Sequence, residues 1–166
     1  MEQIHWIIDN GHGRNMKLSN NLTLKEAIYS QTAVYRGISN QPTKEHLDNL
    51  IVVANKIFQP IREHFGVPIF VSSGYRSAEL NKAIKGSSKT SHHLKGLALD
   101  LDADVFGGIT NAEIFNFVKD NLEFSQLIWE YGNDDQPNWV HISYEEGKNI
   151  KKVMRCYSKS DYRIIK

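Results

Sequence analysis

The sequence predicts one α+β domain in which an antiparallel sheet is flanked by helices. Apolar residues recur at three- and four-residue spacing over residues 44–65, the pattern of an amphipathic helix. Runs with the composition and alternation of strands come later in the chain, at residues 97–101, 126–131 and 139–144. This order, with helices first and the sheet late, favours the α+β class.

The whole chain, residues 1–166, is expected to form that single domain. A chain of 166 residues is long enough to bury one hydrophobic core. No internal repeat, low-complexity segment or interdomain linker interrupts it. We expect the core to span about residues 21–157 and residues 1–20 to be an N-terminal extension.

The composition excludes several classes of protein. Hydrophobic residues make up 40% of the chain, charged residues 23%, and the net charge is +1. This balance gives no basic surface field, so we expect no nucleic-acid partner. No apolar run approaches the ~20 residues that span a bilayer, and the first residues lack the basic and apolar regions of a secretory signal. We therefore expect a protein that is cytoplasmic when it is made and leaves the cell, if at all, by lysis or another route.

The chain has a single cysteine, Cys156. One cysteine excludes an internal disulfide and a cysteine-based zinc site. We expect Cys156 to be a thiol of the core.

The first half of the chain is expected to be mostly helical. After a short strand at residues 4–8 and a polar loop, Thr23 and Glu26 have the spacing of a capping box that begins a helix. The long helix at 44–65 contains Pro60, which removes one backbone hydrogen bond and is expected to kink the helix.

The second half is expected to supply the sheet. The strand at 97–101 should project Ala98, Asp100 and Asp102 from one side, because successive side chains of a strand alternate between its faces. A last strand at 150–157 completes the sheet, and the lysine-rich tail is expected to fray. The remaining elements that we expect are a strand at 68–73, helices at 77–84 and 110–121, and strands at 126–131 and 139–144.

Histidine and aspartate residues in two separate segments have the types and number of ligands that a catalytic zinc site uses. Asp100 follows the pair His92-His93, and His141 lies in the strand-like run at 139–144. Two imidazoles and one carboxylate can hold Zn²⁺ and leave its fourth position to water, as in catalytic rather than structural sites. Zinc lowers the pKa of bound water towards ~7 and polarises a carbonyl group. Adjacent residues of an extended segment point in opposite directions, so only one of the two neighbouring histidines can face the ion, and the residues alone do not decide which.

Two further charged residues are candidates for the chemistry. Arg76 follows a strand that ends at Gly74, and its guanidinium can bind a carboxylate or a polarised carbonyl oxygen. The alternative for Arg76 is an ion pair with Glu79 or another surface acid. Glu130 follows three large apolar residues, and we expect it to be the general base that a hydrolase needs beside its metal. The alternative for Glu130 is a charged strand terminus.

At these residues the chain resembles the zinc D-Ala-D-Ala carboxypeptidases, a family that also contains phage endolysins cutting L-Ala-D-Glu bonds. The family pattern Ser-x-His-x-x-Gly-x-Ala-x-Asp is matched over Ser91–Asp100, and Ser-Gly-Tyr-Arg-Ser is matched over Ser73–Ser77. The run Trp-Val-His-Ile-Ser resembles the strand that carries the third ligand. The resemblance extends from about residue 21 to residue 144 and is particularly close to short, single-domain bacterial and phage members. It implies the hedgehog/DD-peptidase-like fold that this family shares with the hedgehog signalling domain.

The resemblance also implies roles for particular residues. The metal ligands would be His93, Asp100 and His141, which resolves the choice within the histidine pair. Arg76 would contact the peptide and help to stabilise the oxyanion, and Ser91 would assist at a carboxylate or carbonyl of the substrate. The implied protein is a zinc metallopeptidase that hydrolyses peptidoglycan stem peptides, as a D-Ala-D-Ala carboxypeptidase or an L-Ala-D-Glu type endopeptidase. We expect it to be a monomer that reaches the cell wall after release from the cell.

The sequence departs from the family pattern at the catalytic base. Many members carry Glu three residues before the last histidine ligand or His two residues before it, and here those positions are Asn138 and Trp139. Glu130 is our substitute for that base. The departure also supports an alternative, a zinc-containing module that binds the cell wall or a protein without cutting it. A scaffold role in a phage particle or secretion apparatus is a third, weaker interpretation.

The N-terminal segment Ile7–Gly13 resembles the opening of a different class, the zinc N-acetylmuramoyl-L-alanine amidases. In that class the histidine equivalent to His12 binds zinc. No other part of the class follows in this chain, so we interpret the segment as a strand and turn without a metal.

Overall fold

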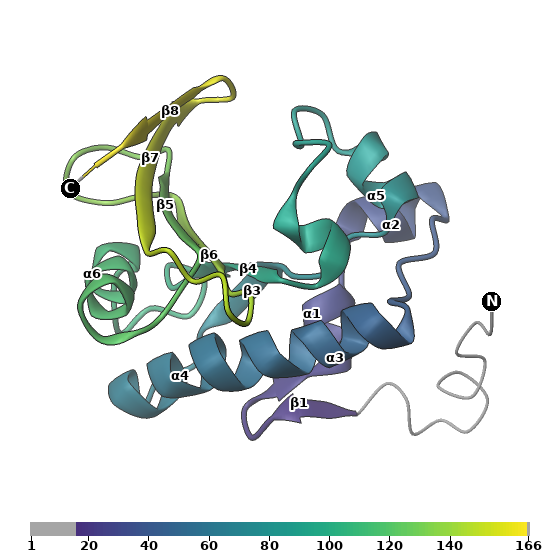
Figure 1. Cartoon of the computed structure of the whole chain (residues 1–166), viewed down its shortest axis with the longest axis horizontal. Coiled ribbons are helices and arrows are strands. Elements are labelled where there is room, and N and C mark those ends of the chain that lie inside the picture. Colours follow the sequence, from purple (N-terminus) through teal and green to yellow (C-terminus); the bar gives the residue numbers. More distant parts are fainter. Residues whose placement is uncertain (1–15, 166) are drawn as a thin grey trace.

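The computed structural model describes residues 16–165 (Figure 1), and in this part of the chain helices and strands form one α+β domain, as expected. The N-terminal part contains β1 (Lys17–Ser19), β2 (Leu22–Thr23), α1 (Leu24–Ile28), α2 (Gln31–Arg36), α3 (Lys44–Val53) and α4 (Gln59–Phe65). The middle contains β3 (Phe70–Ser73), α5 (Ala78–Ala83), a 3₁₀ helix (His92–Lys95), β4 (Ala98–Asp102) and α6 (Asn111–Asn121). The C-terminal part contains β5 (Gln126–Glu130), β6 (Trp139–Ser143), β7 (Lys152–Ser158) and β8 (Asp161–Ile164).

The main sheet has six strands in the order β3-β4-β6-β5-β7-β8. The sequence predicted an antiparallel sheet. Neighbouring strands are antiparallel except for β5 and β7, which run parallel, so the sheet is mixed. The reason is the short connection after β6. The backbone N–H of Lys152 donates to the carbonyl of Ser125, so β7 starts at the end of the sheet where β5 starts. A strand that leaves β6 by such a same-end connection runs opposite to β6 and therefore parallel to β5.

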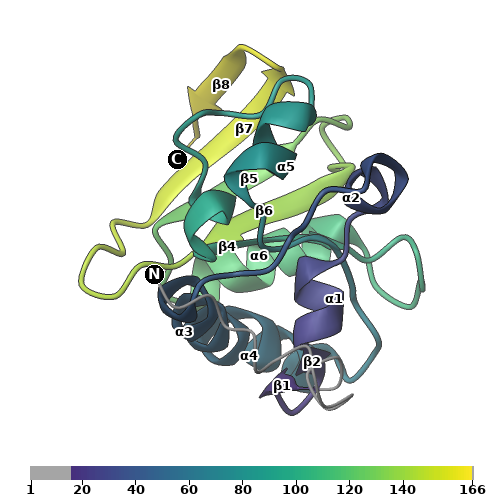
Figure 2. The same cartoon turned by 90° about the vertical axis from the view of Figure 1, so that its right-hand side faces the viewer.

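The sheet has one apolar face, and helices cover it. Strand alternation sends side chains of β4, β5 and β6 into a core shared with α3, α4 and α6. Figures 1 and 2 show these three helices packed below and beside that face. The fully buried strand residues of this core include Leu99, Leu101, Leu127, Val140 and Ile142. The opposite face carries the polar residues described below.

The long helix at 44–65 is continuous but irregular at its centre. Residues Ala54–Phe58 form a π-helical turn between α3 and α4. Pro60, at the start of α4, has no N–H to donate to the preceding turn. The irregularity in this helix therefore takes the form of a single π-turn, which is how π-helix mostly occurs within α-helices.

The ends of the domain differ from the sequence-based expectation. Leu18 is buried in the core and Ile165 packs against it, so the core extends past residues 21–157. The tail that we expected to fray pairs instead with β7 and forms β8. The expected strand at residues 4–8 and His12 lie outside the described residues. None of the helices within residues 16–165 is both long and apolar enough to cross a membrane.

Two glycines at helix ends differ in how closely other atoms approach their backbone. Gly96 ends the 3₁₀ helix with φ 69°, and a Cβ there would lie 2.3 Å from the carbonyl oxygen of His46. Gly37 ends α2 with a similar φ of 64°, but nothing lies within 4 Å of its Cβ position. We expect Gly37→Ala to cost about 1 kcal/mol through its positive φ, and Gly96→Ala to cost about 3 kcal/mol or more because overpacking is added. Urea unfolding of both variants measures the difference, and equal losses would show that α3 moves away freely.

Candidate metal centre

Two of the candidate ligands lie opposite each other on neighbouring strands. Asp100 on β4 pairs with His141 on β6 in the antiparallel register. Leu99 and Leu101, which flank Asp100, enter the core on one face of the sheet. The carboxylate therefore projects from the other face, next to the imidazole of His141.

The third candidate comes from the 3₁₀ helix that precedes β4. The hydroxyl of Ser91 accepts the backbone N–H of His93 at 3.3 Å and so caps this helix. The carbonyl of His93 accepts the backbone N–H of Arg76 at 3.0 Å, which ties the helix to the segment after β3. His93 is fully buried, and its ring lies 5.0 Å from that of His141 between centroids.

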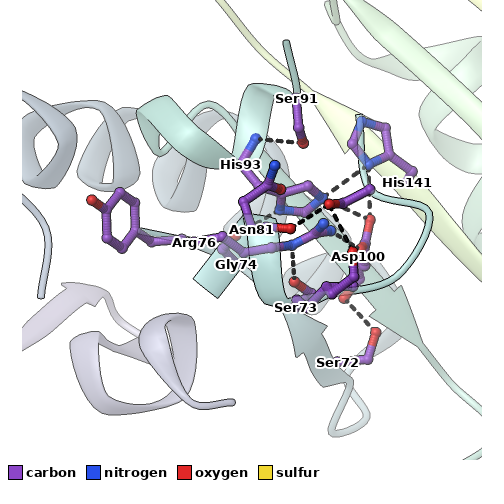
Figure 3. Close-up of polar contacts among 12 residues, drawn as sticks. Ser72, Ser73, Gly74, Arg76, Asn81, Ser91, His93, Asp100 and His141 are labelled. Atoms are coloured by element: carbon purple, nitrogen blue, oxygen red, sulfur yellow. Dashed lines mark hydrogen bonds and ion pairs between the residues drawn. The ribbon is translucent and has the colours of Figure 1, made fainter. Parts of the chain in front are cut away.

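Three potential ligand atoms converge in this place (Figure 3). Nε2 of His93 lies 3.1 Å from Oδ1 of Asp100 and 3.2 Å from Nδ1 of His141, and Nδ1 of His141 lies 2.8 Å from the same Oδ1. Tetrahedral zinc with bonds of about 2.0–2.2 Å separates its ligand atoms by about 3.3–3.6 Å. The observed triangle is slightly tighter than that, so small side-chain shifts would fit it to the ion. Among residues 16–165, the residues of this triangle are a group that could hold a metal ion, and His92 is not part of it.

The hydrogen bond of His93 to Gly74 orients its ring. Its Nδ1–H donates to the carbonyl of Gly74 at 2.6 Å, which leaves the Nε2 lone pair facing Asp100. Burial lowers the pKa of His93 and keeps this ring neutral. A lone pair and a carboxylate that face each other repel unless a cation or proton lies between them. A neutral imidazole oriented by a backbone carbonyl is the usual form of a zinc-binding histidine.

The carboxylate of Asp100 is ionised although it is buried. Burial by itself would raise the pKa of Asp100, but the close contacts with His93 and His141 outweigh it and hold this pKa well below its usual range. Its second oxygen, Oδ2, accepts from Nη2 of Arg76 at 3.2 Å. An ionised carboxylate is the form of Asp100 that binding of a divalent metal requires.

Arg76 belongs to the centre rather than to the surface. Its Nε donates to the hydroxyl of Ser73 at 2.9 Å, and its acidic partner is Asp100, not Glu79. A guanidinium has five N–H donors, and these two contacts use two of them. Arg76 therefore orients a candidate metal ligand and keeps donors for another group.

Glu130 lies on the same face of the sheet as His141. Ile128 pairs with His141, and Glu130 follows two positions later on β5, where it pairs with Trp139. Glu130 is 7% exposed, and burial raises the pKa of its carboxyl group. A raised pKa beside a metal centre is typical of a general base.

Ser73 and Gly74 are two supporting residues that the sequence analysis did not assign. Ser73 accepts a hydrogen bond from Arg76, and the carbonyl of Gly74 holds His93. Gly74 is also packed tightly, because a Cβ there would lie 2.2 Å from the carbonyl oxygen of Ala27. Both residues lie within the motif Ser73–Ser77, and the motif could have drawn attention to them. The role of Gly74 depends on its backbone carbonyl, however, and the type of side chain does not indicate such a role.

One comparison with known proteins identifies a family for this chain. The family model described as peptidase M15 matches residues 20–143, which is about three quarters of the chain and includes every residue of the centre. A search of curated proteins found no significant match.

Metal binding tests the centre directly. His93→Ala, Asp100→Ala and His141→Ala should each weaken zinc binding by at least about 100-fold, which exceeds the usual loss of an outer partner. His92→Ala is the matched control, since it removes the adjacent imidazole and should keep one zinc per chain. Elemental analysis and competition with a chelator measure both outcomes. Zinc loss in His92→Ala with retention in His93→Ala would reverse the assignment.

Proposed function

The chain belongs to the peptidase M15 family, and from that premise we propose that it is a zinc peptidase that cleaves the stem peptides of peptidoglycan. The family consists of zinc metallopeptidases. The observation that carries the proposal is the buried triangle of His93, Asp100 and His141. Three protein ligands are the number that catalytic zinc sites use.

The donor set suits zinc, and these three residues would hold it. Bound zinc supplies a Lewis acid that activates water and polarises the scissile carbonyl group. The chain's own contribution is orientation. Gly74 fixes the ring of His93, and Arg76 holds the free oxygen of Asp100, so the ligands need little rearrangement.

Glu130 is our proposed general base. Its carboxylate would take a proton from the attacking water and return it to the leaving amine. Two observations support this role. Glu130 lies two residues after Ile128, the residue on β5 that pairs with His141, and Glu130 is buried. A backbone contact between Glu130 and the position that many relatives use also supports this proposal. Asn138 donates its backbone N–H to the carbonyl of Glu130, so the two candidate positions lie side by side across β5 and β6.

Arg76 and Ser91 are our proposed substrate-binding residues. The remaining donors of Arg76 would bind a carboxylate or the developing oxyanion, an effect typically worth ~2.7–4 kcal/mol per donor. The hydroxyl of Ser91 accepts the N–H of His93, and its own hydrogen can donate to the substrate.

The proposed substrate follows from the matched motifs. They resemble those of D-Ala-D-Ala carboxypeptidases and of L-Ala-D-Glu endopeptidases, and both bonds lie in the peptidoglycan stem. We propose that the protein acts as a monomer and reaches this substrate after release by cell lysis or another route.

One observation favours a second candidate. Asn138 and Trp139 occupy the positions where many relatives carry the base. A zinc-containing module that binds the wall without cutting it would have this composition.

Digestion of purified cell walls separates the two candidates. The zinc-loaded protein should release fragments that mass spectrometry assigns to loss of a terminal D-Ala or to cleavage between L-Ala and D-Glu. His93→Ala should release none, because it lacks a metal ligand. Retention of the native protein on the wall without any new fragment would favour the binding module.

Replacement of Glu130 tests the base. Glu130→Gln should keep zinc and lose about 10²- to 10⁴-fold in kcat, the usual contribution of a general base. A base works only when deprotonated, and burial raises the pKa of Glu130. The activity of the native protein should therefore fall as the pH drops through a value above the ordinary glutamate pKa. Glu79→Gln, on the exposed start of α5, is the control and should change neither rate nor pH profile. A fully active Glu130→Gln would move the base elsewhere.

A further inference from the structure

Glu130, the proposed base, has a paired residue on each neighbouring strand. On one side β6 pairs Trp139 with Glu130, and on the other side β7 pairs Cys156 with it. Figures 1 and 2 show β7 running beside β5 in the main sheet. Neighbouring strands lie about 4.7–4.9 Å apart, so paired residues project adjacent side chains from one face. An indole and a thiol therefore flank Glu130 on the face that carries the metal centre.

The two sides of Glu130 differ in their access to water. Trp139 is half-buried, whereas Cys156 is fully buried. A buried carboxylate is costly unless polar groups compensate its charge. Water can supply such groups on the side of Trp139, but on the side of Cys156 only the protein can supply them. The β7 side of Glu130 therefore needs a hydrogen-bond donor of the chain itself.

Cys156 lies in a small cluster that is separate from the main core. Its buried neighbours there are Ile128 and Met154, and the half-buried Tyr131 packs against the cluster. The hairpin closes the cluster from the edge of the sheet, because β8 pairs Tyr162 with Cys156. Ile128 and Met154 carry no donor hydrogen, whereas the thiol of Cys156 does. Cys156 is thus the member of this cluster that can serve Glu130 as a donor from β7.

The thiol keeps its hydrogen and has two acceptors within reach. Burial raises the pKa of Cys156 to about 11, and the carboxylate of Glu130 contributes to this rise. The other acceptor is the carbonyl of Ser158, whose oxygen lies 3.2 Å from Sγ. A thiol has one hydrogen to donate. A hydrogen bond to an ionised acceptor is roughly twice as strong as one between neutral groups, which favours Glu130 over Ser158.

We propose that Cys156 is a positioning residue for the base, whose thiol donates a hydrogen bond to the carboxylate of Glu130 and holds it towards the metal centre. This inference rests on the proposed peptidase function and adds a residue of β7, which lies beyond the matched residues 20–143. A carboxylate held through one oxygen keeps its other oxygen for the water that it deprotonates. The burial of Cys156 keeps solvent from competing for the thiol.

Infrared spectroscopy tests the hydrogen bond without reference to activity. The chain has one cysteine, so its S–H stretching band reports Cys156 alone. The spectra are recorded on zinc-loaded protein at mildly alkaline pH, where Glu130 is ionised and the thiol keeps its hydrogen. The native band should lie at a lower frequency than the band of Glu130→Gln, because an amide oxygen is a weaker acceptor than a carboxylate. A band at the same frequency in both proteins would assign the thiol hydrogen to Ser158 and overturn the inference.

Hydrolysis of a soluble stem peptide tests the effect on turnover. Cys156→Ala should lower kcat by about tenfold or more and change KM by less than about twofold, because a displaced base slows proton transfer but not peptide binding. Cys156→Ser should keep most of the native kcat, since its hydroxyl can donate as the thiol does. In the Glu130→Gln protein, Cys156→Ala should cause no further loss, because the two residues act as a unit.

Met154→Ala is the matched control for packing. Met154 lies two residues before Cys156 on β7 and belongs to the same buried cluster. Its truncation leaves a larger cavity than Cys156→Ala but removes no donor, so it should destabilise the fold at least as much and keep the native kcat. Urea unfolding measures the stability of each variant, and circular dichroism confirms that it is folded.

The outcomes separate this inference from the peptidase function. A native kcat in Cys156→Ala, equal losses in Cys156→Ala and Cys156→Ser, or the same loss in Met154→Ala would show that Cys156 only fills space. Each of these results would overturn the inference and leave the peptidase function standing. A band that shifts in Glu130→Gln, in a native protein that cuts no stem peptide, would overturn the peptidase function and leave the contact of thiol and carboxylate in place. If Cys156→Ser does not fold, the band and the Glu130→Gln background decide.

Discussion

The negative charge of Asp100 is the constraint around which this molecule is arranged. A buried carboxylate is costly unless charges or hydrogen bonds compensate it. Here one oxygen faces the nitrogens of His93 and His141, and the other accepts from Arg76. Those partners come from three separate parts of the chain, so the compensation exists only when the whole fold has formed.

The arrangement of the sheet follows from the same constraint. β4 sends Leu99 and Leu101 into the core and Asp100 to the opposite face. A shift of one residue in register would bury the carboxylate among leucines and expose the leucines. The hydrophobic core and the metal centre therefore specify the same register, and each stabilises the position of the other.

The connections of the sheet decide what surrounds the centre. The short connection after β6 returns the chain to the start of β5, which makes β7 parallel to β5 and places Met154 beside Ile128. The hairpin then adds β8 as the edge strand of the sheet.

The amino-acid sequence by itself determined the local elements and the identities of the reactive groups. The capping box at Thr23 forms as its spacing indicates, because the contacts of a helix start are local. The alternation in β4 likewise indicated that Asp100 faces away from the core. The motifs that resemble the family singled out His93, and the structure brings that residue, not its neighbour, to Asp100 and His141.

Only the tertiary structure decided how these elements meet. It paired Arg76 with Asp100 instead of a surface acid, and it held His93 through the carbonyl of Gly74. In the folded chain the C-terminal tail also forms β8, and β5 and β7 pair in parallel. Each of these outcomes depends on backbone groups or on residues far apart in the chain. Local sequence patterns do not encode contacts of backbone groups, because every residue has the same backbone groups. They do not encode contacts between distant residues either, because the entropic cost of closing a long loop is offset only when the complete domain packs.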